Sequence, residues 1–164
     1  MKALVSNGKN DLNLLDLPEP VCGPDDLKIK TQQIGVCGTD LEIIHNKMDP
    51  EYIRYPATIG HEWTGKVIEI GSNVKGFEIG QRVVVEGLIP CQKCHECAIG
   101  ATNRCLTYDE IGFTRPGGGS EKVLIPARMA HKINENVTVE SAQLAEPTCV
   151  VMNAYTKADL APGL

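Results

Sequence analysis

The chain has 164 residues, and 42% of them are hydrophobic, which is enough for one domain with a sizeable core. A net charge of −5 without a basic block argues against nucleic acid as the main partner, and no apolar run approaches the ~20 residues that span a bilayer. Seven cysteines without an export signal indicate a reducing compartment, so we expect a cytoplasmic protein with no membrane partner.

Glycine and proline interrupt the first 126 residues frequently, and short β-rich segments lie between them. Their β-branched residues and alternating polarity predict strands at Ala3–Val5, Leu27–Val36, Val67–Ile70, Arg82–Val85 and Lys122–Ile125. Many short strands joined by frequent turns are typical of a β-barrel or a β-sandwich.

Two segments have helical character. A short helix is expected over Asp40–Asn46, capped by its first residue or by Thr39. A longer helical segment runs over Ser141–Ala158, and Pro147 inside it predicts a kink or a late start. The last residues, 161–164, have the sequence of a turn that leads into a further strand. We therefore interpret the chain as a fragment cut at a domain boundary, the alternative being a natural tail.

Four cysteines form a C-x2-C-x2-C-x7-C pattern within a segment of about residues 88–106: Cys91, Cys94, Cys97 and Cys105. Four thiolates at this spacing can surround one tetrahedral zinc ion, and a closed set of four leaves no position for a substrate. The spacing therefore predicts a structural zinc site. Disulfides fit poorly because no secretory signal precedes them. An iron–sulfur cluster is the other alternative, although Leu106 stands where the usual cluster motif has proline.

A second set of possible metal ligands is scattered along the chain. Cys37 follows a predicted strand, His61 and Glu62 lie in a glycine-flanked segment, and Glu146 precedes a proline at a helical start. Alone, each of these residues is more often a packing or solvated residue. Ligands on loops at strand ends suit an open metal site with one exchangeable position.

Together these segments resemble the N-terminal catalytic domain of the zinc-dependent medium-chain alcohol and polyol dehydrogenases. The matching motifs are Gly35–Asp40, Gly60–Val67, the four-cysteine segment and Ala145–Pro147, the last as in the sorbitol, threonine and glucose dehydrogenase branch. The resemblance implies a mainly β fold with short helices, in which residues 1–164 form a GroES-like barrel core with a zinc lobe. It also implies a nicotinamide-binding Rossmann domain after Leu164, and no G-x-G-x-x-G motif for such a domain occurs within this chain.

By this resemblance, Cys37 and His61 bind a catalytic zinc ion. Glu62 and Glu146 complete its coordination, either directly or through the bound water. Cys149, about one helical turn after Glu146, is a competing third ligand.

The resemblance also gives roles to three residues around these ligands. Asp40 accepts a hydrogen bond from the far ring nitrogen of His61, which fixes the tautomer of a metal ligand. Thr39 passes the substrate proton outward. Glu42 stands where the next member of the proton relay is often histidine, and we expect it to hold a sugar or polyol hydroxyl. The alternative for Glu42 is a solvated residue on a short helix.

The implied full enzyme oxidises a secondary alcohol, namely a polyol, cyclitol or sugar, to a ketone by hydride transfer to NAD or NADP. It carries one catalytic and one structural zinc ion, takes a small-molecule alcohol and forms a homo-oligomer. The alternatives are a threonine-type dehydrogenase for an amino alcohol, and a non-catalytic binding module stapled by zinc. We expect the 164-residue chain alone to be inactive, because hydride transfer needs a nicotinamide ring held close to the substrate.

Overall fold

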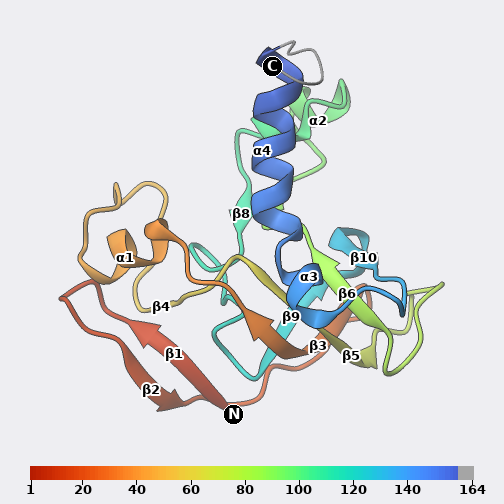
Figure 1. Cartoon of the computed structure of the whole chain (residues 1–164), viewed down its shortest axis with the longest axis horizontal. Helices are drawn as coiled ribbons and strands as arrows, with labels where there is room; N and C mark the ends of the chain where they lie inside the picture. Colours follow the sequence, from red (N-terminus) through yellow and green to blue (C-terminus); the bar gives the residue numbers. More distant parts are fainter. Residues whose placement is uncertain (159–164) are drawn as a thin grey trace.

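The computed structural model describes residues 1–158 and shows ten strands, four α-helices and two 3-10 helices (Figure 1). The strands are β1 (Lys2–Ser6), β2 (Asn13–Asp16), β3 (Asp26–Ile34), β4 (Ala57–Thr58), β5 (Trp63–Ile70), β6 (Arg82–Val85), β7 (Leu88–Ile89), β8 (Asp109–Glu110), β9 (Lys122–Pro126) and β10 (Ala130–Lys132). The helices are α1 (Gly38–Ile44), α2 (His95–Ala98), α3 (Val139–Gln143) and α4 (Ala145–Ala158), with 3-10 turns η1 (Thr102–Arg104) and η2 (Ala127–Met129).

A five-stranded antiparallel sheet with the order β10-β6-β5-β3-β9 forms the centre of the fold. Strand β3 pairs with β5 on one side and β9 on the other, and register shifts interrupt the β3–β5 pairing. Leu27, Ile29, Val67, Val83 and Val123 come from its strands and are essentially inaccessible to solvent. The central sheet therefore supplies most of the main hydrophobic core.

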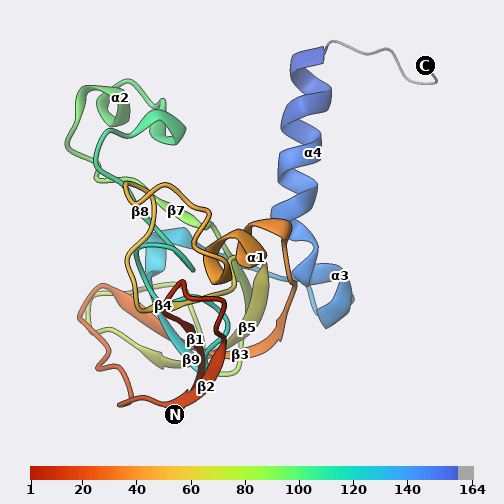
Figure 2. The same ribbon diagram turned by 90° about the vertical axis from the view of Figure 1, so that its left-hand side faces the viewer.

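Two smaller sheets complete the β structure. One has the order β2-β1-β4, and the other joins β7 to β8 at the base of a lobe that contains α2 and η1 (Figure 2). All pairings between the named strands of residues 1–158 are antiparallel. This part of the chain is therefore mainly β, as predicted, and its named strands form no parallel sheet. No helix in the described part is both long enough and apolar enough to cross a membrane.

A second, smaller core holds α1 in place. Ile43 on the inner face of α1 is fully buried against Ile53, Ala57, Ile59 and Phe113. The position of α1 matters because its first residues follow Cys37 directly.

The five predicted strands are all present; β6 has the predicted bounds, and the ends of the other four differ. The largest difference is in β5, which begins at Trp63, four residues before the predicted start at Val67. The helix predicted over Asp40–Asn46 begins earlier, at Gly38, and its N-cap position is Cys37. Thr39 or Asp40 as the cap was therefore wrong, because Asp40 instead sits in the first turn and accepts the Cys37 backbone N–H.

The predicted C-terminal helix is divided into α3 and α4, and Leu144 separates them. Thr138 caps α3 by accepting the Ser141 backbone N–H. Pro147 lies in the first turn of α4, where a missing N–H costs little, so the late start is confirmed. Figures 1 and 2 show α4 extending away from the sheets. The turn and strand expected at residues 161–164 lie outside the described residues.

Candidate metal centres

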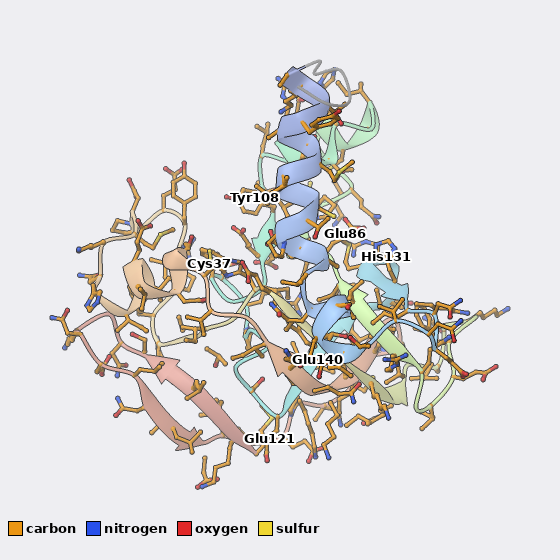
Figure 3. The ribbon with its side chains drawn as sticks, in the orientation of Figure 1. Cys37, Glu86, Tyr108, Glu121, His131 and Glu140 are labelled. Atoms are coloured by element: carbon orange, nitrogen blue, oxygen red, sulfur yellow. The ribbon has the colours of Figure 1, made fainter. Side chains whose placement is uncertain are left out.

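Cys37 lies at the junction between β3 and α1, at the centre of the molecule (Figure 3). Its Sγ is 3.6 Å from Thr39 Oγ1. The pKa of the Cys37 thiol is lowered, first by the backbone N–H of Thr39 and then by the Thr39 hydroxyl and His61, against the opposing effect of burial. The fold therefore favours a thiolate at this position, which is the form that binds metals.

His61 lies just before β5, and a close approach of two backbones fixes its position. Gly60 has a φ of +97°, and a Cβ there would lie 3.0 Å from the Gly119 backbone nitrogen. The Gly118 N–H donates to the Gly60 carbonyl at 2.7 Å. The ring of Phe113 packs on the imidazole with a centroid separation of 5.2 Å. Glycine at position 60 is therefore required both for the backbone conformation and for this packing.

Asp40 is completely buried behind both residues and connects them. Its carboxylate accepts the backbone N–H of Cys37 at 2.9 Å and that of Gly60 at 3.2 Å. Its Oδ1 lies 3.6 Å from Nδ1 of His61, slightly longer than a hydrogen bond, and Nδ1 is buried with no other partner within residues 1–158. With Nδ1 directed at Asp40, Nε2 is the ring nitrogen left for a metal.

The charges around His61 favour the imidazolium when no metal is present. Burial opposes the charged ring, but Asp40 and then the Cys37 thiolate outweigh it and raise the pKa of His61 to about 9. Burial likewise raises the pKa of Asp40, but His61 and the two backbone N–H donors outweigh it and lower that pKa. An imidazolium at His61 supplies one positive charge beside these two acidic groups, and a divalent cation would supply two.

Cys37, His61 and Glu62 bring one sulfur, one ring nitrogen and one carboxylate oxygen within 4.8 Å of one another. Thiolate, imidazole and carboxylate are the three ligand types that zinc takes in proteins, and three protein ligands leave a fourth position open. The donor set therefore fits a catalytic type of zinc site.

A cavity of about 640 Å³ opens beside this group, between α4 and the four-cysteine lobe. His61 lines it, and so do Glu146 and Cys149 on the first turns of α4. Neither Glu146 nor Cys149 belongs to the group within 4.8 Å, so Glu62 is the acidic ligand that the structure brings nearest to Cys37 and His61. Cys149 is exposed to solvent.

The cavity has an acidic wall that the sequence analysis did not anticipate. Glu110 at the end of β8 is half-buried there, and burial raises its pKa, with Glu146 adding to the effect and His61 opposing it. Glu86 and His131 form a pair at 2.7 Å on the same wall (Figure 3). Nothing in the local sequence around these residues marks them, because they meet only through the pairing of β6 with β10 and β7 with β8.

Glu42 is not brought to this cavity. Its side chain lies on α1 and is exposed, and it is not among the cavity-lining residues of the described part. Thr39 is half-buried beside Cys37, as described above.

The four cysteines of the lobe converge as the spacing predicted, each offering a sulfur within 4.8 Å of the others. Cys91 and Cys97 have their sulfurs 3.9 Å apart, and so do Cys94 and Cys105. Sulfurs placed tetrahedrally at ~2.3 Å from zinc lie roughly 3.8 Å apart, so this geometry fits one ion. A disulfide would need ~2.05 Å, and the seven cysteines of the chain are all free thiols.

Hydrogen bonds favour the thiolate form of Cys91, which is the form that binds a metal. The Thr107 side chain, followed by the backbone N–H groups of Lys93 and Cys94, lowers the pKa of Cys91 to about 5. Burial and the neighbouring thiols raise the pKa of Cys97 to about 12. Without a cation the four sulfurs therefore cannot all ionise, and a bound zinc ion would remove that conflict.

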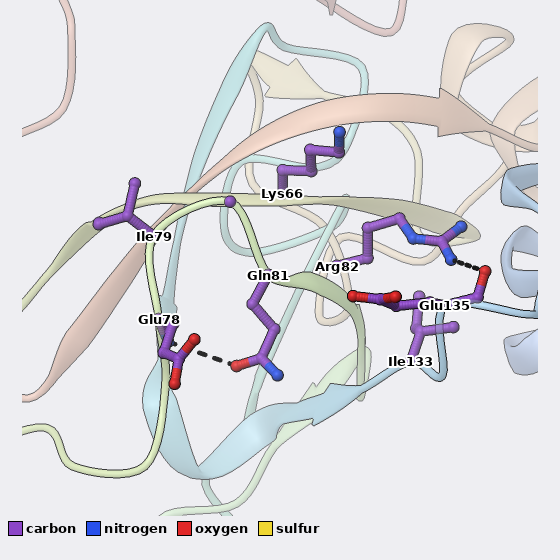
Figure 4. Close-up of a pocket in the computed structure, with 8 residues that line it drawn as sticks. Lys66, Glu78, Ile79, Gln81, Arg82, Ile133 and Glu135 are labelled. Atoms are coloured by element: carbon purple, nitrogen blue, oxygen red, sulfur yellow. Dashed lines mark hydrogen bonds between the residues drawn. The ribbon is translucent and has the colours of Figure 1, made fainter.

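A second cavity, of about 480 Å³, lies on the surface between β6 and the segment after β10 (Figure 4). The Arg82 guanidinium donates there to the carbonyls of Asn134, Glu135 and Val137. These contacts tie the segment after β10 to the edge of the sheet. Arg82 thus has a structural role at this cavity.

The fold and the two groups of candidate metal ligands fit a zinc-binding domain of the alcohol dehydrogenase type. Residues 23–135 match the family of alcohol dehydrogenase GroES-like domains, and the chain belongs to this family.

Similar proteins extend the comparison to the whole chain. The L-threonine 3-dehydrogenases of Alteromonas mediterranea and Escherichia fergusonii are 38% and 39% identical over 149 residues, which are 90% of this chain and 44% of each relative. The crystal structure of galactitol-1-phosphate dehydrogenase from Escherichia coli superposes with a TM-score of 0.89 at 29% identity, over 96% of this chain and 45% of that one. That of 2R,3R-butanediol dehydrogenase from Bacillus subtilis gives 0.88 at 29%, over 99% and 48%. The chain therefore spans less than half the length of these proteins.

Proposed function

We propose that this chain is the zinc-binding catalytic part of an enzyme that oxidises a secondary alcohol to a ketone by hydride transfer to NAD or NADP. The observation that carries the proposal is the group formed by Cys37, His61 and Glu62, whose donor atoms lie within 4.8 Å beside a cavity of about 640 Å³. Family membership and the dehydrogenases of similar structure support it.

Different residues of the chain would have different roles in this reaction. Cys37, His61 and Glu62 would hold the zinc ion, with Glu146 close by at the cavity. A zinc ion bound there would act as a Lewis acid on the substrate hydroxyl. Asp40 orients His61 and balances its charge. The Thr39 hydroxyl, next to Cys37, would accept the proton that the alcohol gives up and pass it toward solvent.

The charges of the cavity support a polyol, cyclitol or sugar as the substrate. Glu86, Glu110 and Glu146 line it, and its lining within the described residues includes no lysine or arginine. Carboxylates accept hydrogen bonds from hydroxyl groups and attract ammonium groups, but they repel phosphate. A neutral polyhydroxylated substrate therefore fits, and a phosphorylated one does not. The threonine dehydrogenases among the relatives favour an amino alcohol as the second candidate.

We further propose that residues 1–164 form one catalytic domain, that residues 88–106 form its structural zinc lobe, and that a nicotinamide-binding domain follows Leu164. Seven free thiols support a cytoplasmic location. Exposed Ile99 and Leu106 on the lobe are candidates for contacts in a homo-oligomer. The net charge of −5 supports a small-molecule substrate rather than nucleic acid.

Metal analysis tests the proposed site directly. The chain, stripped of metal and reloaded with Co²⁺, should bind two ions per molecule, and its thiolates should give charge-transfer absorption. Cys37→Ser should lose one ion and Cys94→Ser the other, while Cys149→Ser should keep both. Mild chelation should remove the ion at Cys37 first, because an open, partly carboxylate site holds metal less tightly than four thiolates. Equal retention of both ions, or one ion per molecule, would contradict the proposal.

Activity is tested separately. The zinc-loaded chain, given polyols, cyclitols, sugars and L-threonine with NAD and NADP, should show no measurable turnover, because a cofactor that meets the site only by diffusion forfeits an effective molarity of ~10⁵ M or more. The protein extended past Leu164 through a cofactor domain should oxidise a member of this panel. Turnover by the 164-residue chain would show that a cofactor site lies within it.

A further inference from the structure

Gln143, the last residue of α3, is a buried amide that the sequence analysis did not consider. Only 8% of the residue is exposed.

Its position is defined by the backbone of Gly35. A Cβ on Gly35 would lie 2.1 Å from Gln143 Nε2 and 2.4 Å from Glu62 Oε2. The amide nitrogen and the carboxylate oxygen thus share the space that a side chain at residue 35 would fill. The Gly35 N–H also donates to the Glu62 carbonyl at 2.6 Å, which ties the end of β3 to the residue before β5.

We propose that Gln143 is a positioning residue for Glu62: when a metal is bound at Cys37 and His61, the amide donates to Glu62 Oε2 and leaves the other carboxylate oxygen for the metal. This inference rests on the proposed metal site. An amide suits the task because it donates a hydrogen bond without titrating. Glycine at residue 35 is what allows α3 to bring the amide this close.

Three substitutions test the idea through metal affinity, measured by competition between Co²⁺ and a chelator in the 164-residue chain. Gln143→Met keeps the volume and removes the donor, and Gln143→Glu replaces the donor with a carboxylate. Both should weaken binding at the Cys37 site by about 10- to 100-fold, as losses of hydrogen bonds behind metal ligands do. Gly35→Ala fills the shared space and should weaken binding at least as much.

Matched controls separate positioning from packing. Gly38 is the first residue of α1, three positions after Gly35, and a Cβ there meets nothing within 4 Å, so Gly38→Ala should leave binding at the wild-type level. Gln81→Met removes a half-buried amide at the other cavity and should also leave it unchanged. The Co²⁺ absorption of the lobe should be the same in all variants. Only the bands of the Cys37 site should shift in the Gln143 and Gly35 variants.

The outcomes distinguish this inference from the proposed function. Two ions in the wild type, loss of one in Cys37→Ser and wild-type affinity in both Gln143 variants would overturn the positioning role alone. A single ion in the wild type would overturn both proposals. If Gln143→Met does not fold, Gln143→Glu and Gly35→Ala still decide between the two roles, because a purely structural role predicts unchanged Co²⁺ bands in whichever variant folds.

Discussion

Replacing Asp40 with asparagine should both destabilise the chain and weaken its metal site. The buried carboxylate accepts two backbone N–H groups, from Cys37 at 2.9 Å and Gly60 at 3.2 Å, one on each oxygen. Asparagine has a single oxygen, so whichever way the amide turns, one N–H must face an NH₂ group. Losing one hydrogen bond to a charged group costs about 1.5–3 kcal/mol, and we expect the unfolding free energy to fall by about 2 kcal/mol.

The pH dependence of this loss follows from the lowered pKa of Asp40. A carboxyl group whose pKa is lower in the folded state contributes stability above its unfolded pKa of about 3.9, and this contribution disappears as pH falls through the folded value. The difference between wild type and Asp40→Asn should therefore be complete above pH ~5 and shrink below pH ~4. Metal affinity should fall by about 10- to 100-fold, because the imidazole loses the carboxylate behind it.

The assays are denaturant unfolding of the metal-free, reduced chain and competitive Co²⁺ titration. Asp16→Asn is the control, because its carboxylate is exposed and its one ion-pair partner within residues 1–158 is Lys2 at the surface. This control should change stability by less than about 0.5 kcal/mol and leave metal affinity unchanged. If Asp40→Asn unfolds like the control and binds Co²⁺ like the wild type, the buried hydrogen bonds of Asp40 do not organise the site.

Three further predictions concern other parts of the fold. Cys97→Ser should abolish metal binding in the lobe and raise amide hydrogen exchange there, while exchange in the central sheet stays unchanged. If the amides of the lobe are as well protected from exchange as in the wild type, no metal holds the lobe. Lys28→Met should destabilise the chain at neutral pH and lose this effect at high pH. The hydrogen bond to Glu69, against the effect of burial, raises the pKa of Lys28, so the stabilisation by the charged lysine disappears only as pH rises through its pKa in the folded state. Denaturant unfolding at several pH values tests this. Gly118→Ala should lower the unfolding free energy by about 1–3 kcal/mol and shift the fluorescence of the single tryptophan, since a Cβ would lie 2.4 Å from Trp63 Cγ. An unchanged emission spectrum would contradict the close packing.

The sequence by itself determined the features that depend on local order along the chain. The spacing of four cysteines between Cys91 and Cys105 required a single compact lobe, because short steps keep the thiols together whatever surrounds them. The strands were predicted for a similar reason, since alternation and β-branching are local signals. Element ends and caps were less accurate, because the start of β5 at Trp63 depends on pairing with β3 rather than on its own residues.

Only the tertiary structure decided how the scattered ligands meet. Cys37 and His61 lie 24 positions apart in sequence, and they come together because β3 and β5 pair side by side and Gly60 packs against Gly118 and Gly119. The same packing determined that Glu62, rather than Glu146, lies nearest to them. Gln143 carried no signal in the sequence, because its approach to Glu62 depends on the missing side chain of Gly35, which directly follows β3. Contacts between distant segments are fixed by the packing of the whole core, which local pattern does not encode.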